Sequence, residues 1–125
     1  MDLEQYFEQN KGLGVLATAN AEGEVDAAIY ARPHVIDEKT VAFIMRDHLT
    51  YANIKSNPKA CYLFRQDSTG YVGKRLYLTM TREETDIELI ESLRRSSKAY
   101  SEHDDSKKFL VYFNIDNIRP LVGDA

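Results

Sequence analysis

The sequence predicts a mainly β protein with a minor helical part, in which six short strands and two or three helices form a small barrel or sandwich. Three observations predict this class. Apolar and polar residues alternate with period two in several short segments, turn residues separate those segments, and few segments have apolar residues at helical spacing. Because 125 residues suffice for one modest core, we expect a single domain over residues 1–125.

The chain begins with an expected helix. Leu3, Tyr6 and Phe7 lie at helical spacing, and Asp2 is a suitable cap, which predicts a helix over residues 2–10.

A hairpin and a third strand are expected next. Residues 12–20 and 25–35 have the character of strands, and the turn at 21–24 contains Gly23, which adopts a positive φ at little cost. A second turn leads to a third strand over residues 40–45.

The middle of the chain is expected to form a short helix between strands. The helix covers residues 50–57 and ends before Pro58, which disfavours helical backbone in the residue before it. A fourth strand follows over 59–66, then a loop at 67–70 and a fifth strand over 71–81.

A helix and a last strand are expected in the C-terminal third. Thr81–Glu84 has the spacing of a capping box, and apolar residues recur every third position from Ile87 onward. Residues 96–107 are polar and are expected to form a loop, whereas residues 108–118 alternate as a strand.

Composition excludes several functional classes. A net charge of −4 argues against nucleic acid as the main partner. No apolar run approaches the ~18 residues of a membrane span, and the acidic N-terminus does not resemble a signal peptide. Cys61 is the single cysteine, so no internal disulfide can form, which fits a reducing compartment. We therefore expect a cytoplasmic protein.

Common catalytic and metal motifs are missing from the sequence. Gly12–Ala17 matches G-x-G-x-x-A, but a helix is expected before it and a hairpin after it, the reverse of a dinucleotide-binding unit. Its glycines fit a strand whose backbone approaches a neighbour. His34, His48 and His103 do not have the spacing of zinc ligands.

The end of the third strand is a candidate anion site. Arg46, His48 and Thr50 lie between a strand and a helix, and Asn53 follows one turn later. A helix N-terminus offers unpaired N–H groups and the positive end of its dipole, which suit a phosphate. The same residues also fit an ordinary cap in which Thr50 bonds its own backbone. Lys74 and Arg75 could likewise approach an anion or lie on a solvated strand face.

The order of these segments resembles a known family. The segments are G-x-L-A-T-A from Gly14, the turn A-E-G-E, A-I-Y-A-R-P-H-V-I-D, V-A-F-I-M, H-L-T-Y-A-N-I-K-S-N-P-K-A, C-Y-L-F and F-L-V-Y-F-N-I-D-N-I-R-P-L. Together they resemble the FMN-binding split-barrel family related to pyridoxamine 5'-phosphate oxidase, from about Leu13 to Leu121.

The resemblance implies a six-stranded antiparallel split barrel that forms a homodimer, with one FMN in each of two grooves at the interface. The phosphate would be held by His48, Leu49, Thr50 and Asn53, with Arg46 as a cation. The isoalloxazine would lie, largely on backbone groups, along Ala28, Ile29, Tyr30, Ala31, Phe43 and Ile44, and the partner subunit would add Lys74 and Arg75.

The sequence also departs from the oxidase. Leu49 and Thr50 stand where the oxidase has an Arg-Lys pair, and the oxidase's C-terminal substrate segment does not follow. We therefore expect a flavin reductase-like or electron-transfer flavoprotein rather than a pyridoxamine phosphate oxidase. Because the family includes members that bind F420, haem or no cofactor, the alternative is one of those ligands, or a non-enzymatic ligand-binding or interaction module without flavin.

Overall fold

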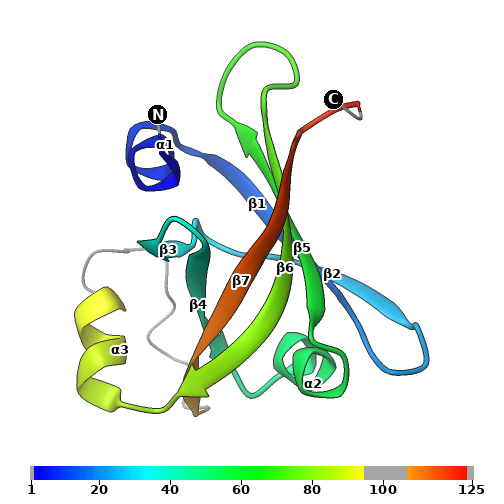
Figure 1. Cartoon of the computed structure of the whole chain (residues 1–125), viewed down its shortest axis with the longest axis vertical. Coiled ribbons are helices and arrows are strands. Elements are labelled where there is room, and N and C mark those ends of the chain that lie inside the picture. Colours follow the sequence, from blue (N-terminus) through cyan, green and yellow to red (C-terminus); the bar gives the residue numbers. More distant parts are fainter. Residues whose placement is uncertain (1, 95–106, 124–125) are drawn as a thin grey trace.

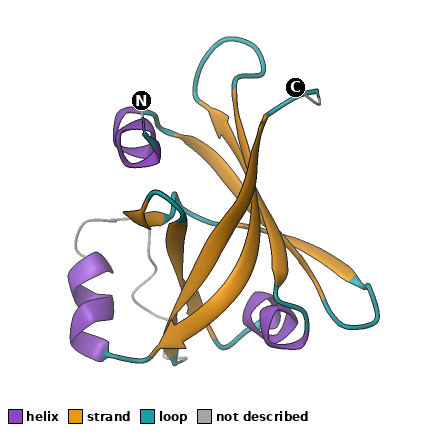
Figure 2. Cartoon of the chain, viewed as in Figure 1, coloured by secondary structure: helices purple, strands orange, loops and turns teal. Residues whose placement is uncertain are grey.

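Seven antiparallel strands form one strongly curved sheet in the computed structural model, which describes residues 2–94 and 107–123 (Figure 1). The strand order is β2-β1-β5-β6-β7-β4-β3, and three helices lie around the sheet in this part of the chain (Figure 2). The mainly β class is therefore confirmed. The elements are α1 (Leu3–Gln9), β1 (Gly12–Ala19), β2 (Val25–Ile29), β3 (His34–Asp37), β4 (Thr40–Arg46), α2 (Leu49–Ser56), β5 (Lys59–Gln66), β6 (Gly73–Glu84), α3 (Ile87–Arg94) and β7 (Lys108–Pro120).

The first helix and hairpin form as predicted. The Asp2 carboxylate caps α1 by accepting a hydrogen bond of 2.9 Å from the N–H of Gln5. Gly23 has a φ of 82°, the left-handed conformation that the turn between β1 and β2 requires. The Gly12–Ala17 motif lies entirely within β1, so it is not a dinucleotide-binding turn.

The predicted strand over residues 25–35 is two strands rather than one. β2 pairs with β1, whereas β3 pairs with β4 at the other edge of the sheet. The chain leaves the sheet before Pro33, which is buried and has no N–H to donate to a strand ladder. The Arg32 guanidinium holds this connection by donating to the carbonyls of Phe7 and Asn10. The described part therefore has seven strands where six were expected.

The predicted start of the third helix was wrong. β6 continues through Thr81–Glu84 and pairs there with β7. Helix α3 begins at Ile87, and its first turn is capped by Asp86, whose carboxylate accepts a hydrogen bond of 3.1 Å from the N–H of Leu89. Pairing with a distant strand outweighed the local capping signal.

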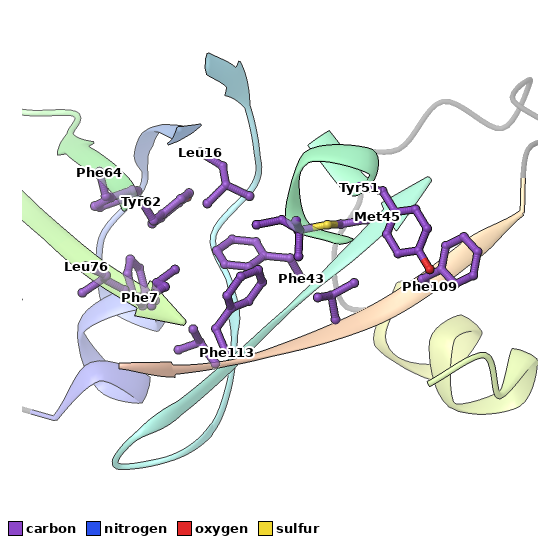
Figure 3. Packing of buried hydrophobic residues seen from close by; sticks show 14 of the residues in the cluster. Phe7, Leu16, Phe43, Met45, Tyr51, Tyr62, Phe64, Leu76, Phe109 and Phe113 are labelled. Carbon is purple, nitrogen blue, oxygen red and sulfur yellow. The ribbon is translucent and has the colours of Figure 1, made fainter. Parts of the chain in front are cut away.

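Aromatic and aliphatic side chains from the inner face of the sheet form the main core (Figure 3). Phe43 lies at its centre, with its ring 5.1 Å from that of Tyr62 and 5.8 Å from that of Phe113, measured between centroids. A second cluster, which includes Ile44 and Leu110, lies between the opposite face of β4 and β7 and helix α3. Both faces of β7 are therefore buried along its first half. The predicted alternation of side chains over residues 108–118 is present in this strand.

None of the helices in residues 2–94 and 107–123 has the length and apolar character needed to cross a bilayer. The expected loop at 96–107 lies, apart from its last residue, outside the described residues.

Candidate functional site

The first turn of α2 is a candidate anion site. His48 is its N-cap residue, with extended backbone, and makes no side-chain hydrogen bond to the turn. The first N–H groups of a helix have no partner inside the helix, so those of Leu49, Thr50 and Tyr51 lack a side-chain cap within the described part of the chain. These N–H groups and the positive end of the helix dipole favour a negatively charged ligand.

The Thr50 side chain is buried at this turn. Only 6% of Thr50 is exposed, and no hydrogen-bond partner for its hydroxyl is found among the described residues. The expected alternative, a cap in which Thr50 bonds its own backbone, is not seen. Because buried polar groups are almost always hydrogen-bonded to protein or to ordered molecules, this hydroxyl is a candidate to bond a ligand at the turn.

Asn53 anchors the same face of α2 to the sheet. Its Nδ2 donates a hydrogen bond of 3.1 Å to Oγ1 of Thr18 on β1, and each of the two residues is 4% exposed. One N–H of this amide is thus engaged, while the second remains available.

The neighbouring face of α2 is tied to β6 and β7. Tyr51 is buried, and its hydroxyl donates a hydrogen bond of 2.6 Å to Oε2 of Glu83. Its ring is stacked on Phe109 with centroids 4.1 Å apart. Burial, followed by the hydrogen bond and negative charge of Glu83, raises the pKa of Tyr51. These contacts fix the helix at the end of β4.

Charged and exposed groups of both signs flank this turn, including the acidic Asp47. Arg46 ends β4 and is half-buried, whereas His48 and Leu49 are exposed. The structure therefore brings together the five residues predicted to hold a phosphate, which are Arg46, His48, Leu49, Thr50 and Asn53.

Two of the residues predicted to line a flat ring system, Tyr30 and Phe43, meet in space. Ala28 and Ile29 end β2, and Tyr30 and Ala31 follow. The Tyr30 ring makes an edge-to-face contact with Phe43 of β4, with centroids 5.8 Å apart. The side chains of Phe43 and Ile44 are buried in the two clusters of the core, so a ligand would meet these two residues through their backbone.

Backbone groups are available on β4 for this purpose. β3 pairs with β4 only at Thr40, Val41 and Ala42, so residues 43–45 have no paired strand along that edge in the described part of the chain. β2 is also an edge strand, paired with β1 alone. An unpaired strand edge offers a row of N–H and C=O groups to a ligand.

Lys74 and Arg75 lie away from the α2 turn. Lys59, which closely follows α2, pairs with Thr79, whereas Lys74 pairs with Phe64 near the far end of β5 (Figure 1). Lys74 Nζ lies 4.7 Å from the centroid of the Tyr6 ring. Arg75 Nε donates a hydrogen bond of 2.8 Å to the carbonyl of Pro120. Within one chain, the structure does not bring these two cations to the predicted phosphate site.

The outward face of β1, β2 and β5 is apolar, and its side chains are exposed or half-buried. We call it the outer apolar face; its members are Leu13, Val15, Ala17, Val25, Ala27, Ile29, Cys61 and Leu63. Strand register places Ile29, Val15 and Leu63 side by side in one row. Ile29 is 74% exposed in the single chain. Burial raises the pKa of the Cys61 thiol, which favours its neutral, unreactive form.

No group of three or more His, Cys, Asp or Glu side chains with the arrangement of a metal site is found in residues 2–94 and 107–123.

Two contacts at this site were not predicted from the sequence. Thr18 and Glu83 lie 35 and 32 residues from their partners Asn53 and Tyr51. The sequence did contain information that Thr18 is buried, because the alternation of β1 places Leu16 and Thr18 on the same inward face. A hydroxyl at an inward position requires a partner.

Comparison with known proteins identifies the fold. No protein-family model matches the chain, and no curated protein matches its sequence. Among solved structures, an FMN-binding protein from Syntrophomonas wolfei subsp. wolfei has a TM-score of 0.76 at 20% identity. The match covers 95% of this chain and 83% of that one.

Two further structures are similar. An F420 reductase matches with a TM-score of 0.74 at 14% identity, covering 92% of this chain and 94% of that one. HutZ, the haem storage protein from Vibrio cholerae, matches with a TM-score of 0.68 at 16% identity, and the match covers 96% of this chain and 95% of that one. Proteins assigned provisionally as pyridoxamine 5'-phosphate oxidases have the same fold. The predicted resemblance to FMN-binding split-barrel proteins is therefore confirmed for the structure, and the proteins of this fold differ in their ligand.

Proposed function

We propose that this protein binds FMN and places the phosphate on the first turn of α2. The observation that carries the proposal is the uncapped turn, with the buried Thr50 hydroxyl that has no partner in the described chain. Arg46 and His48 add positive or hydrogen-bonding groups beside it. A phosphate bears about two negative charges and three acceptor oxygens, which suit this set of donors.

The flavin ring system would lie between β2 and β4. The outer edge of β2 and residues 43–45 of β4 have no paired strand in the described part of the chain, and the Tyr30 ring contacts Phe43 between them. This arrangement agrees with the expectation that backbone groups, rather than the buried side chains of β4, contact the ring.

We further propose a homodimer formed through the outer apolar face. In a single chain this face exposes Ile29 and Leu63 on either side of Val15, and Val25 at the other end of β2. Contiguous apolar surface of this kind marks an interaction site. A symmetric interface would use the same face of both copies. Lys74 and Arg75, which lie far from the phosphate turn of their own chain, would then belong to the site of the partner subunit.

The activity would be a redox reaction of the flavin, as in a flavin reductase or an electron-transfer protein. Bound FMN supplies electron transfer, and the protein supplies binding and the electrostatic environment. Leu49 is exposed and apolar, and the buried Thr50 hydroxyl is neutral, so this turn carries less charge than the Arg-Lys pair of the oxidase. The lower charge predicts a modest affinity for FMN.

The test is to titrate the purified protein with FMN, F420 and haem and to follow absorption and fluorescence. FMN binding with two equivalent sites per dimer would support the proposal. Preferential binding of F420 or haem would show that the proposed ligand is wrong and would assign that molecule to the site. Binding of none of the three would support the alternative, a non-enzymatic ligand-binding or interaction module.

A further inference from the structure

Three buried polar residues gather where α2 packs on β1. Thr18, Thr50 and Asn53 are the polar residues with 6% exposure or less in the described part of the chain. Thr50 and Asn53 are three positions apart in α2, so they share one face of the helix. The contact of Asn53 with Thr18 places this shared face against the sheet.

The bond from Asn53 to Thr18 differs from the other polar contacts of α2. The hydroxyl of Tyr51 holds a different face of the helix to Glu83 on β6. Ser56, at the last turn, accepts a hydrogen bond of 2.7 Å from the N–H of Ala21 through its side-chain oxygen. Only the bond to Thr18 lies on the face that carries the unpartnered hydroxyl of Thr50.

We propose that Thr18 is a positioning residue for the phosphate site and determines the preference for a phosphorylated flavin over an unphosphorylated one. This inference rests on the proposed FMN function. By accepting one N–H of the Asn53 amide, Thr18 fixes the orientation of the amide and of the adjacent first turn of α2. Donors that are fixed before binding lose less entropy when the ligand arrives.

The effect should be specific to the phosphate. Thr18 is buried on the inner face of β1, and within residues 2–94 and 107–123 its hydroxyl bonds only to Asn53, so loss of this hydroxyl alters the orientation of the phosphate donors. The backbone edges of β2 and β4 proposed to hold the ring system are not bonded to this hydroxyl. Riboflavin, which has the same ring system and no phosphate, therefore serves as the internal control.

The experiment measures dissociation constants of FMN and riboflavin by fluorescence titration for four proteins: the wild type, Thr18→Val, Thr18→Ser and Leu16→Val. Thr18→Val removes the acceptor at nearly constant volume, whereas Thr18→Ser keeps it. Leu16→Val is the matched control, because Leu16 is fully buried on the same inward face and its loss of a methylene weakens the core without touching the hydroxyl.

We expect Thr18→Val to weaken FMN binding about tenfold, which corresponds to about 1.4 kcal/mol, while riboflavin binding stays unchanged. Thr18→Ser should restore the wild-type ratio, and Leu16→Val should leave the ratio of the two constants unchanged. If Thr18→Val does not yield folded protein, Thr18→Ala replaces it, because it also removes the acceptor and places no methyl group against the Asn53 amide.

A wild-type protein that prefers FMN, with the same preference in the Thr18→Val or Thr18→Ala variant, would overturn the role of Thr18 and leave the FMN function intact. Equal losses for FMN and riboflavin would assign Thr18 a merely structural role and also overturn the inference. A wild-type protein that binds neither flavin would remove the proposed function and this inference together.

Discussion

Tyr51 of α2 donates a hydrogen bond of 2.6 Å to Oε2 of Glu83 on β6, and this bond joins two segments 32 residues apart. Lys55, one turn further along α2, lies 3.3 Å from the other carboxylate oxygen of Glu83. The helix that carries the proposed phosphate turn is thus held to the sheet by a carboxylate with two partners.

Replacement of Tyr51 by Phe should lower the free energy of unfolding at pH 8 by about 1–2 kcal/mol, because a hydrogen bond to a charged group is lost while the ring packing remains. Urea titration followed by circular dichroism measures this change. The matched control is Tyr71→Phe, whose ring is exposed and which should change the free energy by less than about 0.5 kcal/mol.

The contribution of Tyr51 should depend on alkaline pH. The folded state raises the pKa of its phenol through burial and Glu83, whereas an unfolded tyrosine titrates near pH 10. Stability from this group is therefore complete below about pH 10 and falls as the pH rises above that value. The difference between the wild type and Tyr51→Phe should shrink between pH 8 and pH 10.5, and a constant difference would contradict this linkage.

Thr50→Val should weaken FMN binding about ten- to a hundredfold, because a hydrogen bond to a charged group contributes about 1.5–3 kcal/mol. The substitution removes the hydroxyl at nearly constant volume and can be followed by fluorescence titration. Since Thr50 has no hydrogen-bond partner among the described residues, the variant should be at least as stable as the wild type without ligand. Unchanged affinity would remove Thr50 from the phosphate site.

The proposed homodimer should depend on Ile29. A glutamate at this position would place an unpaired charge in the outer apolar face and weaken association by at least about 2 kcal/mol, or roughly thirtyfold. Sedimentation velocity at micromolar concentrations measures the change. Ile36→Glu is the control, because Ile36 is 45% exposed on β3, outside that face. A wild-type monomer that binds FMN tightly would show that the site does not need a second copy.

Gly14→Ala should destabilise the fold by about 1–3 kcal/mol, the usual range for overpacking a core. A Cβ at this position would overlap the Tyr62 hydroxyl and would lie 2.6 Å from the carbonyl oxygen of Tyr30. Chemical denaturation of the single variants and of Gly14→Ala with Tyr62→Phe tests the cause. Tyr62→Phe should lower the free energy of unfolding less in the Gly14→Ala background than in the wild type, because it removes the hydroxyl oxygen that the new Cβ would overlap. Additive effects of the two substitutions would point to another origin.

The residue pattern predicted local structure well where one face of an element was apolar. The alternation in residues 108–118 correctly separated the two faces of β7, and the positive φ of Gly23 followed from the need for a tight turn. The pattern failed at Thr81–Glu84, where a capping-box spacing competes with the strand ladder to β7. A local signal worth about 1 kcal/mol was outweighed by long-range pairing and burial.

The sequence by itself determined the mainly β class, the position of the α2 turn and the residue types around it, because period-two alternation and strand-to-helix boundaries are local properties. The tertiary structure alone decided which distant groups meet there. It paired Thr18 with Asn53 and Tyr51 with Glu83, separated Lys74 and Arg75 from the turn, and broke one expected strand before Pro33. These outcomes depend on strand order and register, which are set by packing between segments far apart in the chain.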